Sequence, residues 1–374
     1  MKEMNVKEKR IPIKNCSIDK FIKYIEKKDV VIFGTGSWLL HMKSDALFSV
    51  FQKAKYLIDN DLSTKEKVLN GVEKKVYHPD ALKEETNCVV LFTSPVYMSD
   101  MYEQICGMNL QGNVECFALP FISIADQEIE KKELLCDKKT NADKIPKIIH
   151  SFWFSGDEKP YEYQRCINTW KEKCPDYDII EWNQANYDCN KNPFLKKAIE
   201  VKAWAFASDY ARLDVVNTYG GFYFDMDVEI LKNFDELRKY SAVFSFSNIF
   251  AINLATFGSE KNNPLLKEIL SIYDDIDVPT EKKDFSKFFQ PSLVREKFDD
   301  LGIRYNGSMQ KINDMIFLPR VYFFPMDTVM FSKDAITDES YAIHYDNFGW
   351  CDGEDKRKKK ADKNKMLWNL VEKF

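Results

Sequence analysis

Short apolar runs that end in glycine or in acidic residues recur along this chain, and they restrict its fold more than any other feature. Residues 30–33 read VVIF and lead into GTGS at 34–37, residues 56–61 read YLIDND, and residues 88–94 read CVVLFTS. Helix-like stretches separate these runs. Buried strands that alternate with helices are typical of a parallel sheet. We therefore predict a small α/β domain over residues 1–124.

The glycine turn after the first run has two interpretations. The sequence GTGSWL resembles the start of a dinucleotide-binding fingerprint, and Asp59 stands where a ribose-binding acid is expected. Leu39 replaces the third glycine of that fingerprint. The turn therefore either binds a nucleotide or nucleotide-sugar, or is a plain structural turn in a Rossmann-like accessory domain. The order of elements is similar to that of small Rossmann-like modules attached to bacterial sugar-modifying enzymes.

The length of the chain and its charge distribution predict a second domain. The chain has 374 residues, whereas single cores stop growing near about 250 to 300 residues. Residues 125–144 are charged and poor in apolar side chains, so we expect a linker there. Apolar runs and helix-like stretches then alternate again. This pattern predicts a second α/β domain at residues 145–355, followed by a basic helix at residues 356–374.

Composition excludes several classes of protein. The formal net charge of -5 argues against binding nucleic acid through overall charge, since neutralising phosphates needs an excess of Lys and Arg. The 9 cysteines lack CxxC pairs, and the basic N-terminal residues are not followed by the apolar region of a signal peptide. We expect a cytoplasmic protein with reduced thiols. No run approaches the roughly 20 apolar residues of a membrane span, so any membrane contact is expected to be peripheral.

The sequence GGFYFDMD at residues 220–227 is the central motif. Its apolar strand delivers Asp225 and Asp227 to the carboxyl end of a strand, which is where open α/β sheets bind ligands. Two close carboxylates repel each other unless a cation compensates them. Mg²⁺ and Mn²⁺ prefer oxygen ligands and are commonly held by one or two carboxylates and the phosphates of a substrate. The motif therefore favours a diphosphate-bearing substrate, and a solvated strand end is the alternative.

Upstream of this strand, Asp209 and Arg212 stand three residues apart in the helix-like sequence ASDYAR. Residues at this spacing share one face of a helix. The two side chains either form a surface ion pair or contact a ligand. In the second case we expect Asp209 to bind sugar hydroxyls, and Arg212 to bind the sugar or the diphosphate, because a guanidinium offers several donors to phosphate oxygens.

Three segments together resemble a known family. They read IPKIIHSFWF at residues 145–154, ASDYARLDVVNTYGGFYFDMDVEIL at residues 207–231 and YAIHYDNFGW at residues 341–350. They resemble the DXD-containing glycosyltransferases of the capsular-polysaccharide and mannosyltransferase-like family, glycosyltransferase family thirty-two, which is related to the sugar-transferring domain of large clostridial toxins. The resemblance implies a GT-A fold, a nucleotide-sugar donor, Mn²⁺ or Mg²⁺, and transfer with retention of configuration. It implies a UDP-sugar as donor and a glycan or lipid-linked glycan of the bacterial surface as acceptor.

The resemblance also implies roles for single residues. Asp209, Arg212 and Asp225 correspond to the catalytic and donor-sugar contacts. Trp153 corresponds to an early aromatic that stacks on the nucleotide base, and Trp350 to an aromatic of a late loop that covers the donor. The metal ligands of the family correspond to Asp225, Asp227 and His344.

The late segment departs from the family pattern, because Gly349 stands where a small hydroxyl residue usually precedes the tryptophan. This departure affects the correspondence of His344, Asn347 and Trp350 with the family pattern. A hydrogen-bonded core histidine is the alternative for His344, and simple packing is the alternative for Trp350 and for Trp153.

The C-terminal segment combines KRKKK at residues 356–360 with the apolar sequence MLW at residues 366–368. Such a helix either lies on an anionic membrane surface, which would suit a lipid-linked acceptor, or docks its apolar side on the protein. Membrane binding would place the protein at the inner face of a bacterial membrane.

Two other functions are compatible with these motifs. The first is an NAD-dependent enzyme that modifies nucleotide-sugars, with the cofactor at GTGSWL. The second is a noncatalytic protein that binds nucleotide-sugars in the same pocket. Neither explains the combination of Asp225, Asp227 and Arg212 as well as a transferase does.

Overall fold

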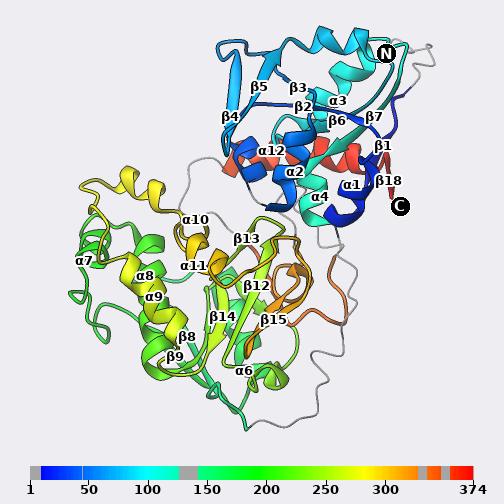
Figure 1. The fold of residues 1–374 in the computed structure, drawn as a ribbon. Helices are drawn as coiled ribbons and strands as arrows, with labels where there is room; N and C mark the ends of the chain where they lie inside the picture. The colour runs from blue at the N-terminus through cyan, green and yellow to red at the C-terminus, as the bar shows by residue number, and fades with distance from the viewer. Residues whose placement is uncertain (1–9, 44, 126–141, 327–334, 347–353, 374) are drawn as a thin grey trace. The chain divides into compact units, whose positions relative to one another are not determined.

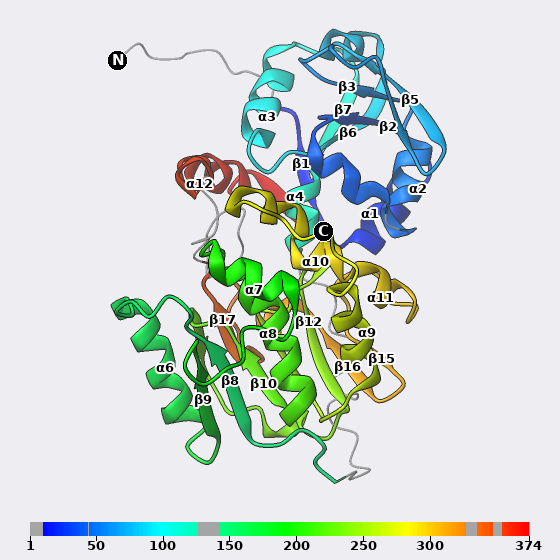
Figure 2. The same ribbon diagram turned by 90° about the vertical axis from the view of Figure 1, so that its left-hand side faces the viewer.

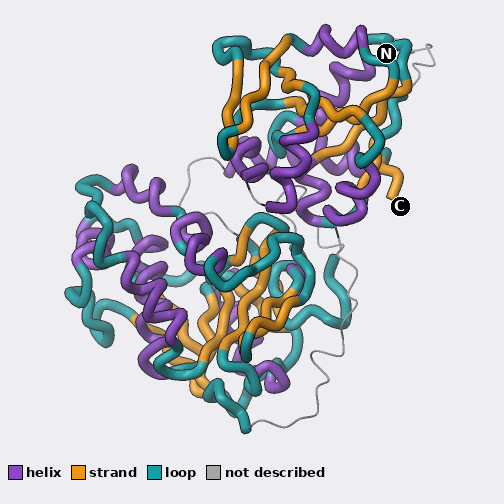
Figure 3. Tube along the Cα trace, in the orientation of Figure 1, coloured by secondary structure: helices purple, strands orange, loops and turns teal. Residues whose placement is uncertain are grey.

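The computed structural model describes residues 10–43, 45–125, 142–326, 335–346 and 354–373. The chain divides into two compact units. The first contains the described residues up to 125 together with 354–373, and the second contains the others. In each unit the strands form a central layer with helices outside it (Figure 3). The expected charged linker, residues 125–144, lies mostly outside the described residues.

The first unit is built on a sheet with the strand order β18-β1-β7-β6-β2-β3-β5-β4 (Figure 1). All neighbouring strands are parallel except β4 and β5. The strands are β1 (Ile13–Asn15), β2 (Asp29–Phe33), β3 (Tyr56–Ile58), β4 (Glu66–Leu69), β5 (Val72–Tyr77), β6 (Asn87–Phe92), β7 (Asn113–Ala118) and β18 (Val371–Lys373). The helices are α1 (Ile18–Tyr24), α2 (Asp45–Lys53), α3 (Met98–Gly107), α4 (Leu119–Ile124) and α12 (Glu354–Trp368), with 3₁₀-helices η1 (Ser37–Lys43) and η2 (Pro79–Glu84).

The C-terminal segment returns to this first unit, whereas the sequence suggested a separate helix. Helix α12 buries Ala361, Asn364 and Leu367, which lie three residues apart on one side of the helix. Asn364 donates from Nδ2 to the carbonyl of Pro95 at 2.9 Å. Strand β18 then pairs in parallel with β1. The apolar side of this helix therefore docks on the protein, and membrane contact stays a prediction.

The second unit has a mixed sheet in the order β15-β16-β12-β14-β10-β8-β9, with β13 beside β12. Its strands are β8 (Ile148–Phe152), β9 (Asp178–Trp182), β10 (Gly221–Phe224), β12 (Ala242–Asn248), β13 (Ala251–Ile252), β14 (Thr256–Ser259), β15 (Gln310–Ile312) and β16 (Met315–Leu318). Its helices are α6 (Tyr161–Lys173), α7 (Pro193–Glu200), α8 (Trp204–Tyr219), α9 (Pro264–Ile272), α10 (Gln290–Leu293) and α11 (Arg295–Asp299). The 3₁₀-helices are η3 (Asp235–Leu237), η4 (Lys282–Phe288) and η5 (Arg320–Tyr322).

Strand β10 is fully buried and contributes to both faces of this sheet. Phe222 and Phe224 pack on one side with Trp170 of α6, while Tyr223 packs on the other among residues of α8. Figure 2 shows α8 running along the sheet next to β10. This alternation follows from the two-residue period of a strand. Both units are thus α/β, as predicted, while a GT-A arrangement stays a prediction.

Two short strands, β11 (Val228–Ile230) and β17 (Ala342–His344), form a separate antiparallel pair in the second unit. They join residues more than a hundred positions apart, and β11 lies next to α6. Across the parts of the chain that the structure describes, no helix combines the length and apolar character needed to cross a bilayer.

Candidate functional site

The turn between α8 and β10 depends on two glycines. Gly220 has φ +70° and Gly221 has φ +110°, backbone angles that residues with a Cβ rarely adopt. A Cβ on Gly221 would lie 2.7 Å from the carbonyl oxygen of Ile148, and one on Gly220 would lie 2.8 Å from Cδ of Pro146. The glycine pair therefore lets β10 begin directly beside β8, and it sets Asp225 at the carboxyl end of β10.

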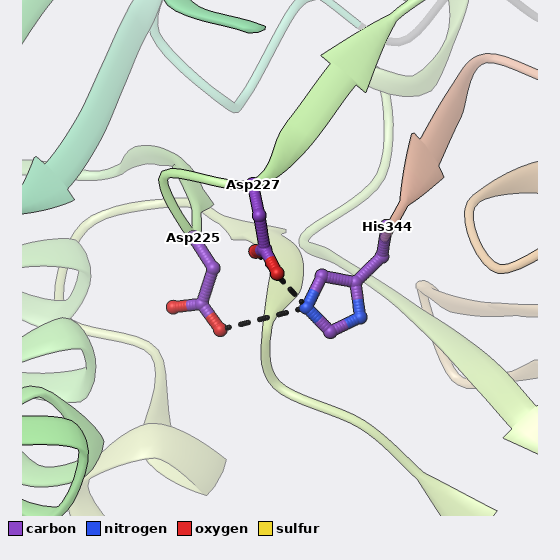
Figure 4. A group of neighbouring side chains, drawn as sticks. All are labelled: Asp225, Asp227 and His344. Atoms are coloured by element: carbon purple, nitrogen blue, oxygen red, sulfur yellow. Dashed lines mark ion pairs between the residues drawn. The ribbon is translucent and has the colours of Figure 1, made fainter. Parts of the chain in front are cut away.

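Asp225, Asp227 and His344 each bring one ligand atom to within 4.8 Å of the others (Figure 4). His344 Nε2 lies 3.3 Å from Asp227 Oδ1 and 3.9 Å from Asp225 Oδ2. The antiparallel pairing of β11 with β17 creates this group, because it sets Val228, the neighbour of Asp227, opposite His344. Two carboxylates are suitable ligands for Mg²⁺ or Mn²⁺, and an imidazole can complete such a set.

The protonation of His344 indicates how strongly this group attracts positive charge. Burial lowers the pKa of His344, but the attraction of Asp227, with Asp346 and Asp225 contributing, raises the pKa to about 9. An imidazolium therefore compensates the carboxylates at neutral pH. A divalent cation would meet the same need with more charge, so these three residues fit the metal that the sequence predicted.

Arg212 joins this group to helix α8. Its side chain is 6% exposed, and one terminal nitrogen lies 3.1 Å from Asp209 Oδ1 and 3.2 Å from Asp225 Oδ1. The guanidinium also donates to Ser208 and to the carbonyl of Leu254. The predicted face shared by Asp209 and Arg212 is therefore present. It is a buried, hydrogen-bonded arrangement rather than an exposed surface pair.

Asp209 has an unusual carboxyl group as a result of this environment. Burial raises its pKa to about 7, Arg212 acts in the opposite direction, and Asp225 raises the pKa further. Perturbed carboxyl groups of this kind are common at functional sites. Gln290 of α10 donates to the backbone carbonyl of Asp209 at 2.6 Å, which fixes this turn of α8.

Tyr223 belongs to the same group, although the sequence did not single it out. Its hydroxyl donates to Asp225 Oδ1 at 2.6 Å, and the guanidinium carbon of Arg212 lies 4.6 Å from the centre of its ring. The available signal was strand alternation. Tyr223 stands two residues before Asp225, so both side chains point to the same face of β10.

Trp153 directly follows β8, whose carboxyl end lies beside that of β10. Its indole N–H donates to the carbonyl of Asp157 at 2.7 Å, and its half-buried ring packs edge-on against Tyr163 at 5.6 Å. Burial raises the pKa of Tyr163 to about 12, with Asp227 the next largest cause. Trp153 and Tyr163 therefore lie near the carboxylate group, and stacking of Trp153 on a base stays a prediction.

His150 lies on β8, close to the glycine turn. His150 is completely buried. Its Nε2 is 2.8 Å from the carbonyl of Gly220, and its Nδ1 accepts from the indole of Trp182 at 3.1 Å. These contacts make His150 a structural residue beside the glycine turn. Trp350, like Asn347, lies outside the described residues.

The glycine turn of the first unit is occupied by a carboxylate of the protein itself. Asp59 Oδ2 accepts hydrogen bonds from the backbone and the hydroxyl of Thr35 at 2.7 and 2.9 Å, and Oδ1 accepts from the backbone of Asp61. The turn continues into the 3₁₀-helix η1 and not into an α-helix. An α-helix at this position provides the pyrophosphate site in dinucleotide-binding folds. These contacts favour the structural interpretation of GTGSWL.

Comparison with known proteins identifies one similar family region in the second unit. Residues 160–244, which contain Asp209, Arg212, Asp225 and Asp227, match the family model described as a glycosyltransferase sugar-binding region containing the DXD motif. The matched segment is similar to this glycosyltransferase region. It does not extend to His344 or to the first unit.

Two relatives are similar in sequence to a part of this chain. An uncharacterized glycosyltransferase of Acanthamoeba polyphaga mimivirus is 29% identical over 141 residues, covering 33% of this chain and 54% of the relative. Inositol phosphoceramide mannosyltransferase 3 of Schizosaccharomyces pombe is 25% identical over 130 residues, covering 34% of this chain and 36% of the relative. The chain thus spans about half of the first relative and about a third of the second. Both relatives are named as glycosyltransferases. A bacterial setting and a link to capsule synthesis stay predictions.

Among solved structures, the chain is similar to PaToxG glycosyltransferase with a TM-score of 0.34 and 16% identity, over 42% of this chain and 69% of the other. This likeness is too low to support a conclusion about fold or function.

Proposed function

We propose that this chain is a metal-dependent glycosyltransferase that takes a sugar from a nucleotide-sugar donor at the carboxyl end of β10. The observation that carries the proposal is that ligand atoms of Asp225, Asp227 and His344 lie within 4.8 Å of one another. The two aspartates belong to the segment that matches a DXD glycosyltransferase region. A divalent cation held by these three residues would supply positive charge to the diphosphate of the donor.

The residues of the chain itself have separate tasks in this proposal. Arg212 is nearly buried and already donates to Asp209 and Asp225. We therefore assign it to orienting these two carboxylates and to adding fixed positive charge, rather than to a direct contact with the diphosphate. Fixed charges in a buried site need no rearrangement when negative charge develops on the leaving group. Asp209 is available for the hydroxyls of the donor sugar.

The finer features of the proposal rest on the resemblance to glycosyltransferase family thirty-two. They are a UDP-sugar as donor, Mn²⁺ or Mg²⁺ as cation, retention of anomeric configuration, and a glycan or lipid-linked glycan as acceptor. In this proposal Trp153 stacks on the base and Trp350 covers the donor. The setting we propose is the synthesis of a bacterial surface glycan at the inner face of the membrane.

A donor screen tests the proposal. Release of nucleoside diphosphate is measured with UDP- and GDP-sugars in the presence of Mn²⁺, Mg²⁺ or EDTA. We expect release that needs the cation and is lost in Asp227→Asn. Asp176→Asn serves as the control, because Asp176 is an exposed partner of Lys147 on another loop.

Each failure of this screen has a distinct meaning. Donor binding without release or transfer would indicate a noncatalytic binding protein. Metal-independent activity with a nicotinamide cofactor would indicate the oxidoreductase alternative. No binding of any donor would refute the transferase proposal.

A further inference from the structure

The strand pair that begins directly after Asp227 and contains His344 is short. Strands β11 and β17 share three residue pairs, from Val228 opposite His344 to Ile230 opposite Ala342. A two-stranded ribbon is marginally stable by itself in water. Any change in its register or twist would move Asp227 relative to His344. The pair therefore needs support from neighbouring side chains.

Part of this support comes from α6, where Trp170 donates to the carbonyl of Val228 at 2.6 Å and Thr169 accepts from the N–H of Ile230 at 2.9 Å. Three further side chains join β11 to the end of β17. Arg165 of α6 donates from a terminal nitrogen to Glu229 Oε2 of β11 at 2.7 Å. Tyr345, which follows β17, donates its hydroxyl to the same oxygen at 2.5 Å. The guanidinium carbon of Arg165 lies 5.2 Å from the ring centre of Tyr345. We call Arg165, Glu229 and Tyr345 the clamp.

The clamp acts on both strands at positions close to the ligands. Glu229 stands two residues after Asp227, and Tyr345 directly follows His344. The backbone N–H of Tyr345 donates to the carbonyl of Asp227 at 3.2 Å. Glu229 therefore joins β11 to the end of β17 through a side chain, next to the point where the backbone joins them.

We propose that the clamp positions Asp227 and His344 for binding a divalent cation. This inference rests on the proposed function, since it concerns the same metal site. The clamp is only partly buried, with Arg165 39% and Glu229 20% exposed. Ion pairs at this exposure contribute little to global stability. Residues that orient metal ligands, in contrast, typically change metal affinity by about 10-fold to 100-fold when they are replaced.

The second unit contains a matched control for these contacts. Lys191 pairs with Asp214 at 2.7 Å with exposures of 38% and 16%. Tyr187 donates its hydroxyl to the same Asp214 oxygen at 2.8 Å, and the Lys191 nitrogen lies 5.1 Å from its ring centre. This group repeats the chemistry of the clamp but includes neither metal ligands nor their neighbours. Tyr187→Phe therefore removes an equivalent hydroxyl away from the metal site.

The test measures binding of Mn²⁺ alone to the full chain by electron paramagnetic resonance. We expect Tyr345→Phe and Glu229→Gln to weaken Mn²⁺ binding by about 10-fold or more, and Tyr187→Phe to leave it unchanged. Arg165→Lys should retain more affinity than Arg165→Met, because it keeps the charge. Thermal melting without metal should shift by similar small amounts in Tyr345→Phe and Tyr187→Phe.

The outcomes separate this inference from the proposed function. Normal Mn²⁺ binding by Tyr345→Phe and Glu229→Gln, with wild-type binding intact, would overturn the clamp and leave the metal site standing. Equal weakening by Tyr187→Phe would also overturn it, since the effect would then be general. A wild-type chain that binds no Mn²⁺ would overturn both proposals.

Discussion

Replacing Asp209 with asparagine is expected to stabilise the folded protein and to abolish its activity. The pKa of Asp209 rises from 3.8 to about 7, mainly because of burial, and this net value includes the favourable effect of Arg212. A folded-state pKa above the unfolded value means that stability is greatest at low pH and is lost as the pH rises toward the folded value. Asparagine has a similar shape and stays neutral, so it avoids this loss.

The size of the effect follows from the pKa difference. Each pKa unit corresponds to about 1.36 kcal/mol, so keeping Asp209 charged above pH 7 costs the folded state about 4 kcal/mol. The side chain is still 15% exposed, and water reduces this cost, so we expect a gain of about 2 to 4 kcal/mol. Arg212 keeps Asp225 and its neutral acceptors as partners in the variant.

Urea unfolding in EDTA at pH 5 and pH 8.5 measures this gain. It should be larger at pH 8.5 by about 2 to 3 kcal/mol, while release of nucleoside diphosphate is lost. Asp214→Asn is the control, because Asp214 lies on the same helix at a similar exposure, 16%, but its partners are Lys191 and Tyr187. A variant less stable than wild type at both pH values, or a gain that does not change with pH, would refute the reasoning.

Three further predictions concern the same site. The pKa of His344 is raised to about 9, so a cation that binds His344 must displace its proton. The affinity for Mn²⁺ should therefore rise up to about tenfold per pH unit between pH 7 and pH 9. An affinity that does not change with pH in titration calorimetry would contradict this. Gly221→Ala should lower stability by more than about 1 kcal/mol or prevent folding, since its Cβ would lie 2.7 Å from the carbonyl of Ile148; melting followed by circular dichroism would reveal it. Tyr223→Phe should lower turnover about tenfold by removing the hydrogen bond to Asp225; unchanged kcat and KM would exclude this role.

Local sequence was sufficient for the part of the site that lies on one helix and one strand. The three-residue spacing of Asp209 and Arg212 predicted a shared helix face, and the two side chains lie 3.1 Å apart. The strand before Asp225 and the glycines before it were also visible, because apolar density and paired glycines are local signals. The position of Asp225 then followed from the position of the end of this strand.

Contacts between distant segments could not be predicted in this way. His344 came from the family resemblance, since nothing near it indicates that β17 pairs with β11. The return of β18 to the first unit had no signal either. Its three residues, VEK, carry a single apolar side chain, so periodicity does not distinguish this strand from a loop. Because β1 and β18 lie far apart in the sequence, their pairing cannot be predicted from local patterns.

The clamp explains why the proposed metal site would depend on more than its ligands. Asp225 is held by β10, Tyr223 and Arg212, all of which belong to one continuous helix–turn–strand segment. Asp227 and His344, in contrast, are held across two chain segments by short backbone pairing and by Glu229. The first half of the site is therefore determined by local sequence and the second half by tertiary contacts. A chain can keep the DXD motif intact and still lose the geometry of His344 if the residues around Glu229 change, so the motif alone is an incomplete criterion for a metal-binding site in chains like this one.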